Sequence, residues 1–185
     1  MKKNITILGI SAFYHDSAAA LIINGAVVAA AQEERFTRVK HDDRFPLESI
    51  RWIVRSLEIN PADIDYVVFY EKPFVRFERL LETYFAYAPV GFSSFRHSMP
   101  RWIKDKLFQK SKILKNLGEI SNSVNWQDKL RFSDHHLSHA ASAFYPSPFE
   151  EAAILTVDGV GEWATTTISL GRNNSIELLS ELHFP

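Results

Sequence analysis

The chain of 185 residues contains no cysteine. Without thiol groups it can form no disulfide bond and can offer no thiolate to a metal ion. This absence excludes the small disulfide-stapled proteins and the cysteine-ligated zinc modules. It is compatible with the reducing cytoplasm, where we expect the protein to reside.

The chain also lacks net charge and long apolar runs. Its 21 basic side chains are balanced by 22 acidic ones, so we expect no general attraction to nucleic acid or to anionic membranes. No apolar run is long enough to span a bilayer. The short one after Lys2 and Lys3 has no clear cleavage site, so we interpret it as a strand and not as a signal peptide.

The most informative segment present is residues 133–144, Ser-Asp-His-His-Leu-Ser-His-Ala-Ala-Ser-Ala-Phe. His135 and His139 stand four positions apart in a predicted helix, so their rings lie on one helix face. Two such imidazoles can share one metal ion. With Ser133 or Asp134 as N-cap, His135 lies in the first turn of the helix, where the helix dipole favours the neutral, metal-binding imidazole.

The same pair of histidines can also be a packed or solvated helix face. A neighbouring apolar stripe is predicted to dock the helix. Its members are Leu137, Ala140, Ala141 and Phe144. The sequence argues against a zinc protease of the His-Glu-x-x-His type, because His136 stands where that motif has its glutamate.

An acidic, glycine-containing turn follows 23 positions after His135. Asp158 begins it, Gly159 and Gly161 allow the backbone to turn with its amides facing an anion, and Glu162 ends it. The two carboxylates are candidates to hold a metal or to order water. An ordinary hairpin turn between two strands, 151–158 and 163–170, is the alternative.

The N-terminal region predicts three strands, at residues 5–10, 17–23 and 26–32. Asn24-Gly25 between the last two is a strong hairpin signal. His15 and Asp16 lie in the first loop as a base beside a carboxylate. Because neighbouring side chains of an extended chain point in opposite directions, the two need not act together, and both are also common turn residues.

Later segments alternate between helix and strand patterns. We predict helices at 46–57, 74–88 and 93–117, and strands at 65–70 and 130–132. The fold class is therefore α/β, with three antiparallel strands followed by parallel crossovers, as in a ribonuclease-H-like domain of the actin family. The basic and aromatic residues of segment 93–117 can indicate RNA binding, but we favour a solvated amphipathic helix and expect no nucleic-acid partner.

Four motifs occur in one order that is typical of a known family. They are residues 8–20, residues 32–42, the His-His-Leu-Ser-His helix and the Asp-Gly-Val-Gly-Glu turn. In these the chain resembles the N-terminal part of the NodU/CmcH-type carbamoyltransferases. The resemblance implies an actin-like ATPase fold, related to the enzymes that make threonylcarbamoyl-adenosine on tRNA. It also implies transfer of a carbamoyl group from carbamoyl phosphate, with ATP and through a carbamoyl-adenylate, to a hydroxyl of a small molecule.

The resemblance also suggests roles for individual residues. It implies a metal on the helix histidines, iron or zinc before magnesium, with His135 and His139 as ligands and Asp158 as a weaker third. The candidate catalytic pair is His15, as base or phosphate contact, with Asp16 orienting the loop. The nucleotide phosphates are expected against Gly159, Gly161 and Glu162. The charged loop after the third strand is either solvated surface or the border of the active cleft, where the phosphate or the acceptor would meet Arg35, Lys40 and His41.

Proline punctuation suggests a boundary at residues 146–148. We expect a first actin-like domain over 1–147 and the opening strands of a second, truncated one over 148–185. The chain alone is then expected to be inactive. Its unfinished sheet should bind the missing C-terminal part of the same protein or self-associate through residues 151–185.

Three alternatives remain beside the small-molecule carbamoyltransferase. A tRNA threonylcarbamoyl transferase shares the histidine helix, but its first loop has a glutamate and a cysteine where this chain has Ser11 and His15. An actin-like sugar kinase would carry Asp-x-Gly in the first strand, which this chain lacks. The chain can also be a non-catalytic binding or assembly module derived from such an enzyme.

Overall fold

The computed structural model describes residues 4–102, 108–159 and 162–183. The chain divides into two compact units, each made of two segments. The first unit contains Met1–Tyr70 and Gln109–Phe132, and the second contains Glu71–Phe108 and Ser133–Pro185. The domain boundary expected near residue 147 stays a prediction.

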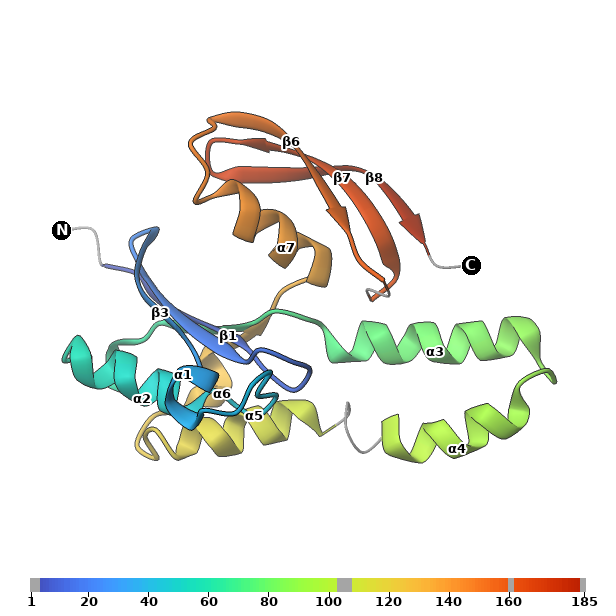
Figure 1. The fold of residues 1–185 in the computed structure, drawn as a ribbon, viewed down its shortest axis with the longest axis horizontal. Coiled ribbons are helices and arrows are strands. Elements are labelled where there is room, and N and C mark those ends of the chain that lie inside the picture. The colour runs from blue at the N-terminus through green and yellow to red at the C-terminus, as the bar shows by residue number, and fades with distance from the viewer. Residues whose placement is uncertain (1–3, 103–107, 160–161, 184–185) are drawn as a thin grey trace. The chain divides into compact units, whose positions relative to one another are not determined.

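The first unit is built on a five-stranded mixed sheet (Figure 1). Its strands are β1 (Thr6–Ser11), β2 (Ala18–Ile23), β3 (Ala26–Gln32), β4 (Tyr66–Phe69) and β5 (Leu130–Phe132). They lie in the order β3-β2-β1-β4-β5, with β1, β2 and β3 antiparallel and β4 and β5 joined in parallel. The predicted α/β class and the predicted antiparallel-then-parallel order are confirmed.

The hairpin between β2 and β3 turns at the two predicted residues. Asn24 and Gly25 both have positive φ, 52° and 86°. A two-residue turn with positive φ at both positions matches the right-handed twist of the flanking strands. The Asn24 side chain also accepts a hydrogen bond from the amide of Ile5, which ties this turn to the start of β1.

The core of the first unit lies on one face of its sheet. Leu8 on β1 stands between Leu21 and Val67, and Leu130 continues the row on β5. Two helices, α2 (Leu47–Ser56) and α5 (Gln109–Gly118), pack on this face. They bury Ile50, Ile53, Ile113 and Leu117 completely. Burial of apolar area at about 25 cal/mol per Å² makes this face the main source of stability for the unit.

The described helices correct the sequence prediction in several places. Three short elements were not expected: α1 (Glu34–Thr37), η1 (Pro61–Asp63) and α6 (Trp126–Lys129). The predicted helix 74–88 is α3 (Pro73–Tyr87). The single helix predicted over 93–117 is wrong, because α4 (Phe92–Trp102) and α5 are separate helices. Pro46 is the N-cap of α2, one position before its expected place.

The second unit contains a three-stranded antiparallel meander. Its strands are β6 (Glu151–Val157), β7 (Ala164–Arg172) and β8 (Ser175–His183), in that order, as predicted. The histidine helix, α7 (His135–Phe144), packs on this sheet (Figure 1). Ala140 and Phe144 of α7 contact the buried Ile154. The helix α7 therefore covers one face of this sheet.

Across the described parts of the chain, none of the helices combines the length and the apolar character that crossing a membrane requires.

Candidate metal centre

The first turn of α7 is held by contacts at its N-cap. Asp134 is the N-cap, as one of the two predicted residues, although its side chain makes no capping hydrogen bond. The carboxylate instead accepts a hydrogen bond of 2.8 Å from the ammonium group of Lys72. The backbone carbonyl of Asp134 accepts a hydrogen bond from the Ser138 hydroxyl. These contacts orient the turn that carries the first histidine.

Three of the predicted site residues converge where α7 meets the end of β6. The Nε2 atom of His135 lies 2.7 Å from Oδ2 of Asp158 and 3.1 Å from Nε2 of His139. One ligand atom from each residue lies within 4.8 Å of the others. Because zinc–nitrogen and zinc–oxygen bonds are about 2.0–2.2 Å long, tetrahedral ligand atoms stand about 3.4 Å apart. The three side chains therefore fit one metal ion with a small adjustment.

The electrostatics of the cluster favour metal-binding protonation states. Burial lowers the pKa of His135, and the hydrogen bond to Asp158 offsets this only in part. Partial burial opposes ionisation of Asp158, but its hydrogen bond and charge interaction with His135 outweigh this, so the pKa of Asp158 is lowered. A neutral imidazole and an ionised carboxylate are the forms that bind metals. The donor set is consistent with zinc or iron.

The acidic turn after β6 uses its two carboxylates differently. Asp158 accepts a hydrogen bond of 2.7 Å from the amide of Gly159, whose Cα is open to an added side chain. Gly161 lies outside the described residues. Glu162 is buried and accepts hydrogen bonds from the amides of Lys72 and His135. Burial raises the pKa of Glu162. In the described structure its carboxylate joins the first turns of α3 and α7.

His136 was not singled out by sequence reasoning, yet it is the buried histidine of α7. The side chains buried along this helix are His136, Ala140 and Phe144. The predicted stripe is wrong at Leu137, which is 43% exposed. The available signal was the spacing of four between His136 and Ala140, which places the histidine on the packed face.

The other predicted cluster lies in the first unit, in the loop between β1 and β2. His15 and Asp16 are in contact, with 2.7 Å between Nδ1 and Oδ2. The argument that neighbouring side chains need not meet is overturned here, because Asp16 has a positive φ of 51° and the chain is not extended. Asp16 also lies 3.0 Å from Nδ1 of His41. Hydrogen bonds from His41 and His15 lower its pKa.

The remaining predicted residues lie on an exposed loop of the same unit. Arg35 is in α1, and Lys40 follows it; both side chains are exposed. The loop is anchored by Asp42, whose buried carboxylate accepts hydrogen bonds from Thr37 and Arg44. Of the three predicted loop residues, His41 is the one whose side chain contacts Asp16.

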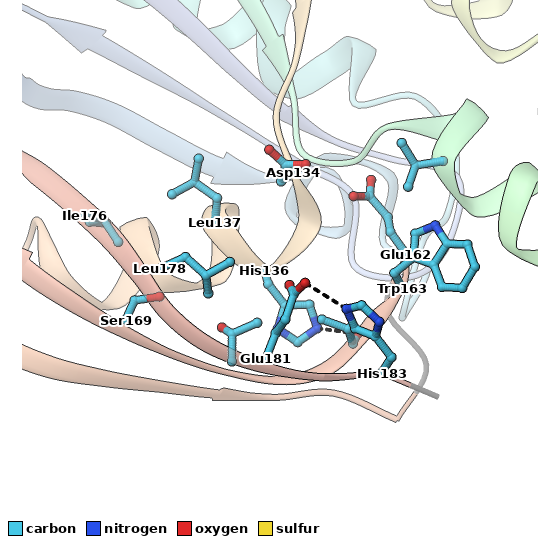
Figure 2. Close-up of a pocket in the computed structure, with 13 residues that line it drawn as sticks. Asp134, His136, Leu137, Glu162, Trp163, Ser169, Ile176, Leu178, Glu181 and His183 are labelled. Atoms are coloured by element: carbon cyan, nitrogen blue, oxygen red, sulfur yellow. Dashed lines mark hydrogen bonds and ion pairs between the residues drawn. The ribbon is translucent and has the colours of Figure 1, made fainter. Parts of the chain in front are cut away.

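A cavity of about 670 Å³ lies beside α7, within the second unit. Figure 2 shows His136 and Leu137 of the helix facing it together with Leu178 and Ile176 of β8. Its lining includes a hydrogen-bonded pair, Glu181 and His183. The ligand atoms of the candidate metal centre are not part of its lining.

Comparison with known proteins supplies the family context. The family model described as carbamoyltransferase N-terminus matches residues 6–185. Protein sll1178 of Synechocystis is 54% identical over 180 residues, which are 97% of this chain and 29% of that protein. The nodulation protein NolNO of Sinorhizobium fredii is 33% identical over 172 residues, 91% of this chain and 23% of that protein. The chain thus spans less than a third of either relative.

Among solved structures, YeaZ from Pseudomonas aeruginosa aligns with 98% of this chain and 68% of its own length. The TM-score is 0.43 and the sequence identity is 13%.

Proposed function

Because the chain belongs to the carbamoyltransferase N-terminal family, we propose that it is the N-terminal part of an O-carbamoyltransferase. The donor is carbamoyl phosphate, activated with ATP as carbamoyl-adenylate, and the acceptor is a hydroxyl group of a small molecule. The observation that carries the proposal is the convergence of three potential metal ligands in a chain whose family match covers residues 6–185. The activity belongs to the whole protein, and the 185-residue chain alone is expected to be inactive.

The proposed metal ligands are His135, His139 and Asp158, whose ligand atoms lie within 4.8 Å of one another. A bound zinc or iron ion would supply Lewis-acid chemistry, polarising a phosphate or carbamoyl oxygen. Support comes from the neutral imidazole of His135 and the ionised carboxylate of Asp158, which their environments favour. Nε2 of His135 would give up the proton of its hydrogen bond to Asp158 when a metal takes the place of that contact.

We propose His15 as the general base for the acceptor. The hydroxyl oxygen attacks the carbamoyl carbon, the bond from that carbon to the adenylate phosphate oxygen breaks, and the hydroxyl proton passes to the imidazole. The Asp16 carboxylate accepts a hydrogen bond from Nδ1 of His15 and supports this role, because a carboxylate on one ring nitrogen orients the other. His41, also bound to Asp16, and the exposed Arg35 and Lys40 are proposed contacts of phosphate or acceptor.

The nucleotide phosphates are proposed to meet the backbone at Gly159 and Gly161. The open space at the Cα of Gly159 supports a close approach there. For Glu162 the direct phosphate contact remains a sequence-based proposal. Its contacts with the amides of Lys72 and His135 support an indirect role, in which the Glu162 carboxylate holds α7 in place.

Metal analysis of the purified chain tests the metal proposal. The double variant His135→Ala/His139→Ala should lose nearly all bound zinc or iron relative to wild type. His97→Ala is the matched control, because His97 is an exposed histidine on α4. Unchanged metal content in the double variant would overturn the assignment.

The transfer reaction requires the full-length protein. With labelled carbamoyl phosphate and ATP, the label should appear in a small hydroxyl compound. Label in tRNA would instead support a threonylcarbamoyl transferase-like enzyme. No transfer by the full-length protein, together with retained binding to a partner, would support a binding or assembly module.

The remaining part of the same protein is the proposed partner of this chain, since both relatives are more than three times as long as the matched segment. In its absence we propose self-association through residues 151–185. The apolar side chains exposed on these strands support this: Leu155, Val157, Ile168, Leu179 and Leu182.

A further inference from the structure

A chain of buried polar groups runs through the second unit beside the candidate metal centre. The Thr167 hydroxyl on β7 lies 2.6 Å from the Thr156 hydroxyl on β6. The Thr156 oxygen lies 2.5 Å from Nδ1 of His136 on α7. Nε2 of His136 lies 2.7 Å from the carbonyl oxygen of Ala164, at the start of β7. All four residues are buried.

The hydrogen-bond directions in this chain follow from its end group. The carbonyl of Ala164 can only accept, so Nε2 of His136 carries a proton and donates it. In a neutral ring with its proton on Nε2, Nδ1 is the acceptor. Nδ1 of His136 therefore accepts from Thr156, and Thr156 accepts from Thr167. Each group has one donor or acceptor role in each bond, so this series of hydrogen bonds specifies one arrangement of the helix and the strands.

This row of hydrogen-bonded groups lies next to the metal ligands, both in sequence and in space. His135 and His136 are consecutive on α7, and they contact Asp158 and Thr156, two positions apart on one strand path. Residues two apart on a strand face the same side. Between them, Val157 is 72% exposed, which confirms the alternation. A slip of one residue would put Val157 against the imidazole and would also move Asp158 away from His135.

We propose that His136, with Thr156 and Thr167, is a positioning device that sets the register between α7 and β6 and so holds His135 and Asp158 at metal-binding distance. The inference rests on the proposed metal function. His136 itself touches no ligand atom of the site; it acts through the helix turn and the strand that carry the ligands. Loss of an outer partner of a metal site typically weakens metal binding about 10–100-fold. Because this contact is one step further removed, we expect the lower end of that range.

The first test uses the metal-free chain. Nitrogen-15 NMR of the histidine rings reports which nitrogen carries a proton, and Nε2 of His136 should be protonated, because it faces the carbonyl of Ala164. A His136 ring without a proton on Nε2 would overturn this hydrogen bond and with it the proposal.

The second test measures cobalt binding, with the visible spectrum of bound Co²⁺ as a readout of ligand geometry. Thr156→Val should weaken binding about tenfold and alter the spectrum. Thr156→Ser, which keeps the hydroxyl, should restore both. Thr166→Val is the matched control, because Thr166 is next to Thr167 on β7 and takes no part in this series of hydrogen bonds. If Thr156→Val does not fold, Thr167→Val removes the first donor and should also weaken binding.

The outcomes separate the two proposals. Wild-type binding by Thr156→Val, folded as judged by circular dichroism, would overturn the positioning role and leave the metal site intact. Absence of cobalt binding by the wild-type chain would overturn the metal site and the positioning role together.

Discussion

Gly171 on β7 lies directly against the ring of Phe144 on α7. A Cβ atom added at Gly171 would stand 2.7 Å from three ring carbons of Phe144, which is itself 4% exposed. The absent side chain is thus what allows the helix to approach the sheet this closely. This contact fixes the C-terminal end of α7, at the opposite end from the histidine cluster.

Gly171→Ala should therefore destabilise the chain by about 1–3 kcal/mol, because the buried ring has little room to move. Urea unfolding at neutral pH measures the effect. Gly118→Ala is the matched control, since nothing lies within 4 Å of an added Cβ there. Adding Phe144→Leu to Gly171→Ala should recover part of the loss. Equal stability of Gly171→Ala and wild type would contradict the described packing.

Asp42 should make the stability of the first unit depend on acid pH. The hydrogen bond from Arg44 is the main cause that keeps the pKa of Asp42 well below its usual range in the folded chain. The ionised carboxylate therefore adds stability above its unfolded pKa of about 4, and this contribution is lost as the pH falls below that value. Asp42→Asn should be less stable than wild type at pH 7, and the difference should shrink toward pH 2.

Unfolding midpoints measured at pH 7, 4 and 2.5 would check this. Asp43→Asn serves as the control, because Asp43 is the exposed carboxylate next to it. A difference between Asp42→Asn and wild type that stays constant over this pH range would show that the charge is not the source.

Glu33 holds the beginning of α2 with a buried carboxylate. It is 3% exposed and accepts hydrogen bonds from the amides of Glu48 and Ser49 and from the Ser49 hydroxyl. Glu33→Gln turns one acceptor into a donor that faces donors, which should cost about 1–3 kcal/mol. Thermal unfolding measures this, with the exposed Glu119→Gln as control. A melting temperature equal to that of wild type would argue against this cap.

The outer face of the second sheet should make the isolated chain self-associate. Leu155 and Ile168 are cross-strand partners on this face and are 66% and 45% exposed. Light scattering should show a molar mass that rises with concentration, and Leu155→Lys/Ile168→Lys should lower it toward the monomer. Val27→Lys, at an exposed apolar position on β3, should not. A wild-type monomer at every concentration would refute the prediction.

Local patterns in the sequence were sufficient for most of the fold. The alternation of β1, the Asn24-Gly25 turn and the proline and glycine breaks are properties of neighbouring residues, so they locate strands and turns without tertiary information. The prediction of one long helix over 93–117 failed where the pattern is basic and aromatic throughout. Pro100 is a local break signal there, but it lies inside α4 and does not mark the end of that helix.

For the site, the sequence by itself determined which residues can bind a metal: helical spacing alone puts His135 and His139 on one face. Only the tertiary structure shows that Asp158 lies beside them, because a separation of 23 residues in the sequence does not determine a distance in space. The role of His136 as a buried hydrogen-bonding residue likewise depends on tertiary packing. Hydrogen-bond partners on β6 and β7 are set by strand register, which only the folded sheet defines.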